Sequence, residues 1–319
     1  MTANRFVVSA ALLSTAALWS VSAQTPGPFR TPWGDPDLQG TWTAEAELSV
    51  PFERPRELGE RQLLTDAEFA ERLARTESQL ESDNSDFDLE TADRSTAGLV
   101  GSATSPPPHW LERRKVSRRT SLVIDPRDGR IPPLTGAASQ RERPRLVSGI
   151  NGADRPDELS HWVRCIGRGM PSAIFPTVYN ANTRIVQAPG VVAITYEMIH
   201  DTRLIYTDGR PHAHQGVRGY FGSSTGRWEG DTLVVDVTNF SEKTDFRGSA
   251  ETLRLVERFR RVGDGLRYEV TVDDPETWTA QWTAALEMEP QAEGMFEYAC
   301  HEGNNSMRNI LSGARANDQ

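Results

Sequence analysis

Cysteines, long apolar runs and an excess of basic charge are all scarce in this sequence. Its 319 residues include two cysteines, and 35 Lys and Arg stand against 45 Asp and Glu. Outside the N-terminal segment, no stretch approaches the ~18 apolar residues that a membrane-spanning helix needs. Phosphate binding requires a basic face. The sequence therefore predicts neither stable membrane insertion of the mature chain nor nucleic acid as its main partner.

Nucleotide-binding signatures are missing too. The sequence has no glycine-rich phosphate loop and no dinucleotide fingerprint. It has no Cys-x-x-Cys pair, so neither a redox motif nor a thiolate zinc site is supported. Strand and helix patterns do not alternate as a parallel βαβ sheet requires. We therefore expect a chain that works on a small molecule without a cofactor.

The N-terminus has the pattern of an export signal. Arg5 precedes an uncharged, mostly apolar stretch at 6–19, and the small residues at 21–23 fit a cleavage site. We predict a signal peptide at 1–23, cleaved between Ala23 and Gln24, and a periplasmic or secreted mature protein.

Export also decides the expected state of the two cysteines. It places Cys165 and Cys300 in an oxidising compartment, where two thiols are expected to pair. We predict a Cys165–Cys300 disulfide. In the chain-entropy model, closing so long a loop contributes roughly 4–5 kcal/mol.

Residues 24–119 are expected to form an N-terminal segment that packs on the main body. The segment is largely extended, because its first part is rich in Pro, Gly and Arg. Its one convincing helix spans 63–81, where Thr65 and Glu68 make a capping box. The stretch at 81–108, first acidic and then rich in Ser, Thr and Pro, is expected to be a long surface loop.

From about residue 120 the apolar residues recur with a period of two, which is typical of half-buried strands. Turn residues separate the runs, and 253–262 with 266–272 makes the clearest hairpin. We predict a mainly β fold in which residues 120–319 form an antiparallel up-and-down (lipocalin-like) barrel, since so many consecutive hairpins close readily into one. The expected strands are 120–125, 184–188, 191–199, 203–207, 232–238, 253–262, 266–272, 282–287 and 296–301.

Four phrases resemble a broad family of exported bacterial proteins, most of which have no assigned activity. They are DLQGTW at 37–42, TSLVIDPRDGRIPPL at 120–134, GRWEGDTLVVD at 226–236 and FEYACHEGN at 296–304. The resemblance implies export and a single domain, and adds no chemistry. The Gly-x-Trp triplets at 40–42 and 226–228 also resemble a signature of lipocalin-like (calycin) barrels, which implies a barrel.

The densest group of candidate catalytic side chains begins at Tyr196. On a strand, Tyr196 and His200 share one face, so both are expected to point into the barrel. We predict His200 as the general base, Tyr196 as the general acid, and Arg203 or Arg218 as the group that holds an oxyanion. The expected enzyme is a lyase, isomerase or dehydratase acting on a small apolar or aromatic compound.

Five further residues are predicted to bind the substrate. His212 and His214 share a face if their segment is extended, and Tyr298 and His301 flank Cys300. Trp228 completes the set.

Other functions remain open. A non-catalytic periplasmic carrier would use the same barrel with an apolar pocket and with the histidines outside. A metal-dependent hydrolase would hold its ion with His212, His214 and either His200 or Glu197. The Gly-x-Ser-x-Gly match at 222–226 lacks the strand-to-helix context of a nucleophile elbow, so we expect a loop there.

Overall fold

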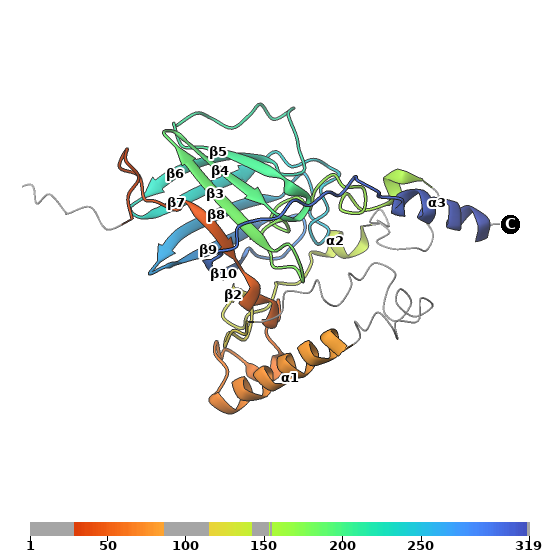
Figure 1. Ribbon diagram of the computed structural model, residues 1–319. Helices are drawn as coiled ribbons and strands as arrows, with labels where there is room; N and C mark the ends of the chain where they lie inside the picture. The colour runs from red at the N-terminus through yellow and green to blue at the C-terminus, as the bar shows by residue number, and fades with distance from the viewer. Residues whose placement is uncertain (1–28, 86–114, 142–152, 154, 318–319) are drawn as a thin grey trace, which may run out of the picture.

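The computed structural model describes residues 29–85, 115–141, 153 and 155–317 (Figure 1). In this part of the chain, nine strands close into a barrel in the order β1-β3-β4-β5-β6-β7-β8-β9-β10, with β10 pairing back to β1. A tenth strand, β2, pairs with the first residues of β10. The predicted mainly β barrel is confirmed. The predicted signal peptide at 1–23 and most of the predicted loop at 81–108 lie outside the described residues.

The barrel is accompanied by few helices. The strands are β1 (Gly40–Thr43), β2 (Val123–Asp125), β3 (Asn182–Ala188), β4 (Val191–Tyr196), β5 (Thr202–Tyr206), β6 (Ser223–Glu229), β7 (Thr232–Thr238), β8 (Arg254–Val262), β9 (Gly265–Asp273) and β10 (Trp282–Pro290). The α-helices are α1 (Asp66–Ser85), α2 (Gly136–Gln140) and α3 (Ser306–Asn317). The 3-10 helices are η1 (Glu45–Ser49), η2 (Arg56–Leu58), η4 (Pro156–Glu158) and η5 (Met198–His200).

The two-residue period of the sequence decides which side chains fill the barrel. In β9, Leu266, Tyr268, Val270 and Val272 are buried, while the residues between them are half-exposed. Strands β3, β4 and β8 alternate in the same way over most of their length, and their inward apolar side chains belong to one core cluster. Large aromatic residues, Trp42 and Trp282 among them, fill the interior with almost no exposure.

An odd number of strands has a topological consequence. If every neighbouring pair were antiparallel, strand direction would alternate around the ring, and a closed ring of nine strands cannot alternate throughout. The barrel meets this constraint between β5 and β6, which are parallel and share one registered pair, Tyr206 with Thr225. The other neighbours around the described barrel pair antiparallel over longer registers. The β5–β6 seam is therefore the least hydrogen-bonded part of the wall.

The N-terminal segment contributes a strand to the barrel and one peripheral helix. Trp42 on β1 is 2% exposed, and β1 joins β3 to β10. The closing strand thus comes from the segment that the sequence predicted to pack outside the barrel. Helix α1 lies outside the barrel, beyond β2 (Figure 1). Its capping box is confirmed, because the Thr65 amide donates to the Glu68 carboxylate at 2.8 Å and the Glu68 amide donates to the Thr65 hydroxyl at 3.4 Å.

Two local predictions are wrong, and one helix was missed. The loop predicted at 222–226 is a strand from residue 223 onward, because the hairpin turn at Gly230 and Asp231 pairs this stretch with β7 as strand β6. Residues 296–301 are not a strand, since their contacts hold them against the η5 region outside the barrel. Helix α3 follows them and was not predicted.

The strand predicted at 191–199 ends at Tyr196 for a visible reason. The buried Glu197 carboxylate accepts hydrogen bonds from the Asn182 side chain at 2.7 Å and from the Phe296 amide at 2.7 Å. The chain then turns through η5, where Ile199 and His200 have φ angles of 65° and 49°. This left-handed backbone cannot continue a strand. None of the helices in the described residues is both long and apolar enough to span a bilayer.

Candidate functional site

Two of the four predicted catalytic residues lie inside the barrel. Tyr196 on β4 is 1% exposed, and Arg203 on β5 is buried against Glu257 of β8. The Arg203 guanidinium donates to both Glu257 carboxylate oxygens, at 2.5 and 3.0 Å. The Tyr268 hydroxyl donates to the same carboxylate at 2.9 Å, and Arg203 also reaches Ser224 of β6 at 3.4 Å. This core ion cluster ties the two sides of the β5–β6 seam to the opposite wall.

The electrostatics of the core ion cluster favour a structural role. Burial, more than any neighbouring charge, raises the pKa values of Tyr196 and Tyr268 well above the usual range for tyrosine. Burial lowers the pKa of Arg203, but the Glu257 carboxylate more than offsets this and raises it. The two phenols therefore keep their protons and the guanidinium keeps its charge. Such groups hold a core together and are poorly matched to proton transfer near neutral pH.

His200 does not face this cluster. It is exposed, and its Nδ1 forms a 2.8 Å hydrogen bond with the backbone carbonyl oxygen of Tyr298. The prediction that Tyr196 and His200 point together into the barrel is wrong, because β4 ends at Tyr196 and η5 carries His200 outward. A proton cannot pass between these two side chains on one enclosed ligand.

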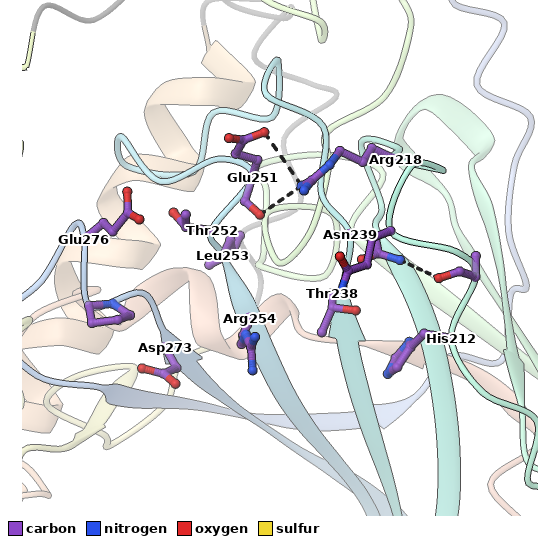
Figure 2. Close-up of a pocket in the computed structure, with 13 residues that line it drawn as sticks. His212, Arg218, Thr238, Asn239, Glu251, Thr252, Leu253, Arg254, Asp273 and Glu276 are labelled. Atoms are coloured by element: carbon purple, nitrogen blue, oxygen red, sulfur yellow. Dashed lines mark hydrogen bonds and ion pairs between the residues drawn. The ribbon is translucent and has the colours of Figure 1, made fainter.

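Two other predicted residues, His212 and Arg218, meet at a cleft on the rim of the barrel (Figure 2). This rim cleft has a volume of about 640 Å³. Four segments form it: the β5–β6 connection, the end of β7, the last residues of the β7–β8 connection with the start of β8, and the end of β9 with the β9–β10 connection. Its lining residues are His212, Ala213, Gln215, Arg218, Thr238, Asn239, Glu251, Thr252, Leu253, Arg254, Asp273, Pro275 and Glu276.

Charges of both signs line the rim cleft. Arg218 and Glu251 form an ion pair at 3.8 Å, and Arg218 also donates to the backbone oxygens of Phe240 and Glu251. Arg254 and Asp273 are directly opposed residues of β8 and β9. Both side chains are exposed, and neither forms an ion pair within 4 Å with another described residue. Figure 2 shows the two side chains at neighbouring strand ends without a contact between them.

His212 supplies a hydrogen-bonding group at the other side of the rim cleft. Its Nε2 lies 3.1 Å from the Thr225 hydroxyl, which orients the ring. Its Nδ1 is buried and has no hydrogen-bond partner in the part of the chain that the structure describes. The neighbouring backbone is fixed by Asn239, whose side-chain amide donates to the Ala213 carbonyl at 2.8 Å. The imidazole is therefore held in place with one nitrogen unused.

The other predicted binding residues do not line the rim cleft. His214 is exposed and accepts a hydrogen bond from the Gly216 amide. Trp228 is half-buried against the barrel core, and His301 is exposed. Tyr298 stacks on Tyr179 with 6.4 Å between ring centroids. His212 and His214 are two residues apart in the sequence, but only His212 lines the rim cleft.

The predicted disulfide is present. Cys165 and Cys300 are bonded, with Cα atoms 5.7 Å apart. The bond fastens the segment before α3 to the connection that precedes β3. It lies near η5, because Tyr298 contacts His200.

The metal alternative finds no support in the described residues, where no group of three His, Cys, Asp or Glu side chains is placed to hold an ion. The proposed ligand Glu197 is buried and bonded to Asn182 and Phe296. His214 and His212 belong to different surroundings, as described above.

Sequence reasoning missed the acidic side of the rim cleft and Arg254. The signal was present in the predicted hairpin, because a register centred on its turn at 263–264 places Arg254 opposite Asp273. Nothing in the sequence pattern indicated that Glu251 or Glu276, both in connections, would join them.

Comparison with known proteins assigns no family to this chain. No family model matches it, and no curated protein matches it. Among solved structures, it is similar to an abundant heat soluble (SAHS) protein from Ramazzottius varieornatus, with 9% sequence identity and a TM-score of 0.24 over 34% of this chain and 70% of that one. A likeness at this level carries no argument about function. The resemblance to exported bacterial proteins therefore stays a prediction.

Proposed function

We propose that this barrel protein binds a small zwitterionic molecule in the rim cleft, as a ligand-binding protein and not as an enzyme. The observation that carries the proposal is the pair Arg254 and Asp273, a cation and an anion on opposed positions of β8 and β9 that form no ion pair within 4 Å with any residue that the structure describes. Opposed Cα atoms in an antiparallel pair are about 5 Å apart. Such a pair matches a molecule whose own two charges are separated by one or a few carbon atoms.

The other lining groups support the same assignment. Arg218 also lines the cleft, and only one nitrogen of its guanidinium is engaged in the hydrogen bonds to Phe240 and Glu251, which leaves others for a carboxylate. Glu276 adds a second carboxylate near Asp273 for an ammonium group. His212 offers an unused nitrogen to a polar substituent. A volume of about 640 Å³ is in the range of small-molecule sites.

Binding is preferred to catalysis because of where the titratable groups lie. Tyr196 and Arg203 are enclosed in the core ion cluster, and His200 is exposed elsewhere. The acid–base reaction expected from the sequence has no assembled acid and base among them. The carrier alternative remains, with a polar cleft at the rim in place of an apolar pocket in the interior.

We also infer that the protein acts outside the cytoplasm. The Cys165–Cys300 disulfide supports this inference, since such bonds persist in oxidising compartments. The N-terminal pattern of the sequence agrees with it. Mass determination of the protein secreted by its native host tests cleavage after Ala23 directly.

Calorimetric titration tests the ligand assignment. We expect glycine, alanine or trimethylglycine to bind with a dissociation constant on the order of 10 µM to 1 mM, given the small number of ligand atoms. Acetate alone and methylammonium alone should bind at least tenfold more weakly, because each uses half of the charge pair. Equal affinity for all three classes would refute a site built for a zwitterion.

Matched variants assign the binding to the rim cleft. Arg254→Gln and Asp273→Asn should each weaken binding about tenfold or more, since a hydrogen bond to a charged group contributes roughly 1.5–3 kcal/mol. Arg260→Gln is the control, an exposed arginine on the same strand that does not line the cleft. A loss of the same size in Arg260→Gln would point to a general effect of charge.

A further inference from the structure

A second cleft lies beside the rim cleft and was not predicted from the sequence. It has a volume of about 470 Å³ and is formed between the β7–β8 connection and the segment that contains His161. Thr244 lines it from the first element, His161 and Arg164 line it from the second, and Tyr220 lies alongside. We call it the His161 cleft. None of the residues predicted to bind or catalyse belongs to it.

Two buried polar atoms of this lining have no hydrogen-bond partner among the described residues. One is the hydroxyl oxygen of Thr244, a residue that is 3% exposed. The other is Nδ1 of His161. Buried polar atoms are nearly always hydrogen-bonded, and an orphan costs stability. Both atoms can donate a hydrogen bond, so a bound acceptor would satisfy them together.

Charges of both signs line the His161 cleft, and two of its cations lack an ion-pair partner in the part of the chain that the structure describes. Arg164 and Lys243 line it, and neither forms an ion pair within 4 Å among the described residues. Arg141 and Asp157 also line it but are paired elsewhere, Arg141 with Glu276 and Asp157 with Arg155. Glu242 and Asp245 are the other acids of the lining. An anionic ligand would supply Arg164 and Lys243 with a partner.

The walls of the His161 cleft indicate what kind of uncharged group such a ligand carries. The His161 and Tyr220 rings lie 5.3 Å apart between centroids and are inclined by 32°. Ala250 adds apolar surface to the lining. A flat apolar group therefore has surfaces to pack on while its charged end reaches the donors.

We propose that the His161 cleft binds a small aromatic monocarboxylate. Its carboxylate accepts hydrogen bonds from the Thr244 hydroxyl, from His161 and from the Arg164 guanidinium. Its ring packs on the face that Tyr220 provides. The site is independent of the rim cleft, since the two share no lining residue.

Titration with benzoate, followed by calorimetry on the full mature protein, tests this proposal. We expect saturable binding at millimolar concentration or below. Benzyl alcohol, which has no charge, and benzylamine, which has the opposite charge, should bind at least tenfold more weakly. Absence of saturable benzoate binding would overturn the proposal and leave ordered water as the partner of the two orphaned atoms.

Two variants separate a binding role from a structural one. Thr244→Val keeps the shape of the side chain and removes the orphaned hydroxyl, so it should weaken benzoate binding about fivefold or more without lowering the melting temperature. Arg164→Gln should weaken it about tenfold. Arg254→Gln, in the rim cleft, should leave benzoate affinity unchanged. Unchanged affinity in both cleft variants, or a loss in Arg254→Gln alone, would contradict the assignment.

Discussion

Glutamine in place of Glu257 leaves Arg203 in the barrel core without a counter-ion. The Arg203 side chain is 3% exposed and the Glu257 side chain 0% exposed, so solvent cannot take over the charge. Two hydrogen bonds link Arg203 to Glu257, and a third comes from Tyr268. The substitution preserves size and removes only the negative charge.

The expected loss in the free energy of unfolding follows from the desolvation of ions. Breaking a buried ion pair by neutralising one partner typically costs about 3–5 kcal/mol, because the remaining charge stays buried. For a domain of this size that loss lowers the melting temperature by roughly 10 °C. Replacing both partners with apolar residues, as in Arg203→Met with Glu257→Leu, should recover much of the loss, since no isolated charge is left.

Urea unfolding followed by tryptophan fluorescence measures the difference. Glu287→Gln is the matched control, because its partner Arg267 and Glu287 itself are 31% and 44% exposed and that pair is worth about 1 kcal/mol or less. A loss below about 1 kcal/mol in Glu257→Gln, equal to the control, would refute the view that a fully desolvated ion pair ties the β5–β6 seam to the opposite wall.

Three further predictions concern stability. Burial raises the pKa of Glu47 to about 7 despite its contact with Arg119, so the native state resists ionisation of this carboxyl. The contribution of Glu47 to the free energy of unfolding should therefore be greatest below about pH 4.5 and should fall as the pH rises to about 7. Glu47→Gln should flatten this pH dependence in denaturant titrations at several pH values. Reduction of Cys165–Cys300, or the double change to serine, should cost roughly 2–5 kcal/mol, since the bond closes a loop of 135 residues. A difference below about 1 kcal/mol between oxidised and reduced protein would contradict this. Thr65→Ala should speed hydrogen exchange in the first turn of α1, because the cap contributes about 1 kcal/mol, and unchanged exchange there would show that packing alone holds the turn.

Much of the barrel is predictable from the sequence because alternation is a local signal. The hairpin of β8 and β9 and the capping box of α1 are each specified within a few residues. The disulfide is predictable for a different reason, since a chain with two cysteines has one way to pair them within itself and the predicted export favours that pairing.

The missed elements depend on partners that are distant in sequence. The stretch that becomes β6 is rich in Ser and Gly, and it is a strand because β7 pairs with it. The closing role of β1 depends on β3 and β10, which follow it by more than a hundred residues. The parallel β5–β6 seam follows only once the number of strands is known.

The candidate sites show the same limit. His200 was placed beside Tyr196 by extending a strand pattern that η5 interrupts, and the interruption depends on the buried contacts of Glu197. The pairing of Arg254 with Asp273 was available from the hairpin register. Their convergence with His212 and Arg218 required the fold, because four separate segments form the rim cleft.

The structure of the protein with a bound zwitterion, trimethylglycine or alanine, tests the central claim most directly. We predict that the ligand lies in the rim cleft, with its carboxylate on Arg254 and Arg218 and its cationic group toward Asp273 and Glu276. A ligand found anywhere else, or a rim cleft that stays empty at saturating concentration, would contradict the account.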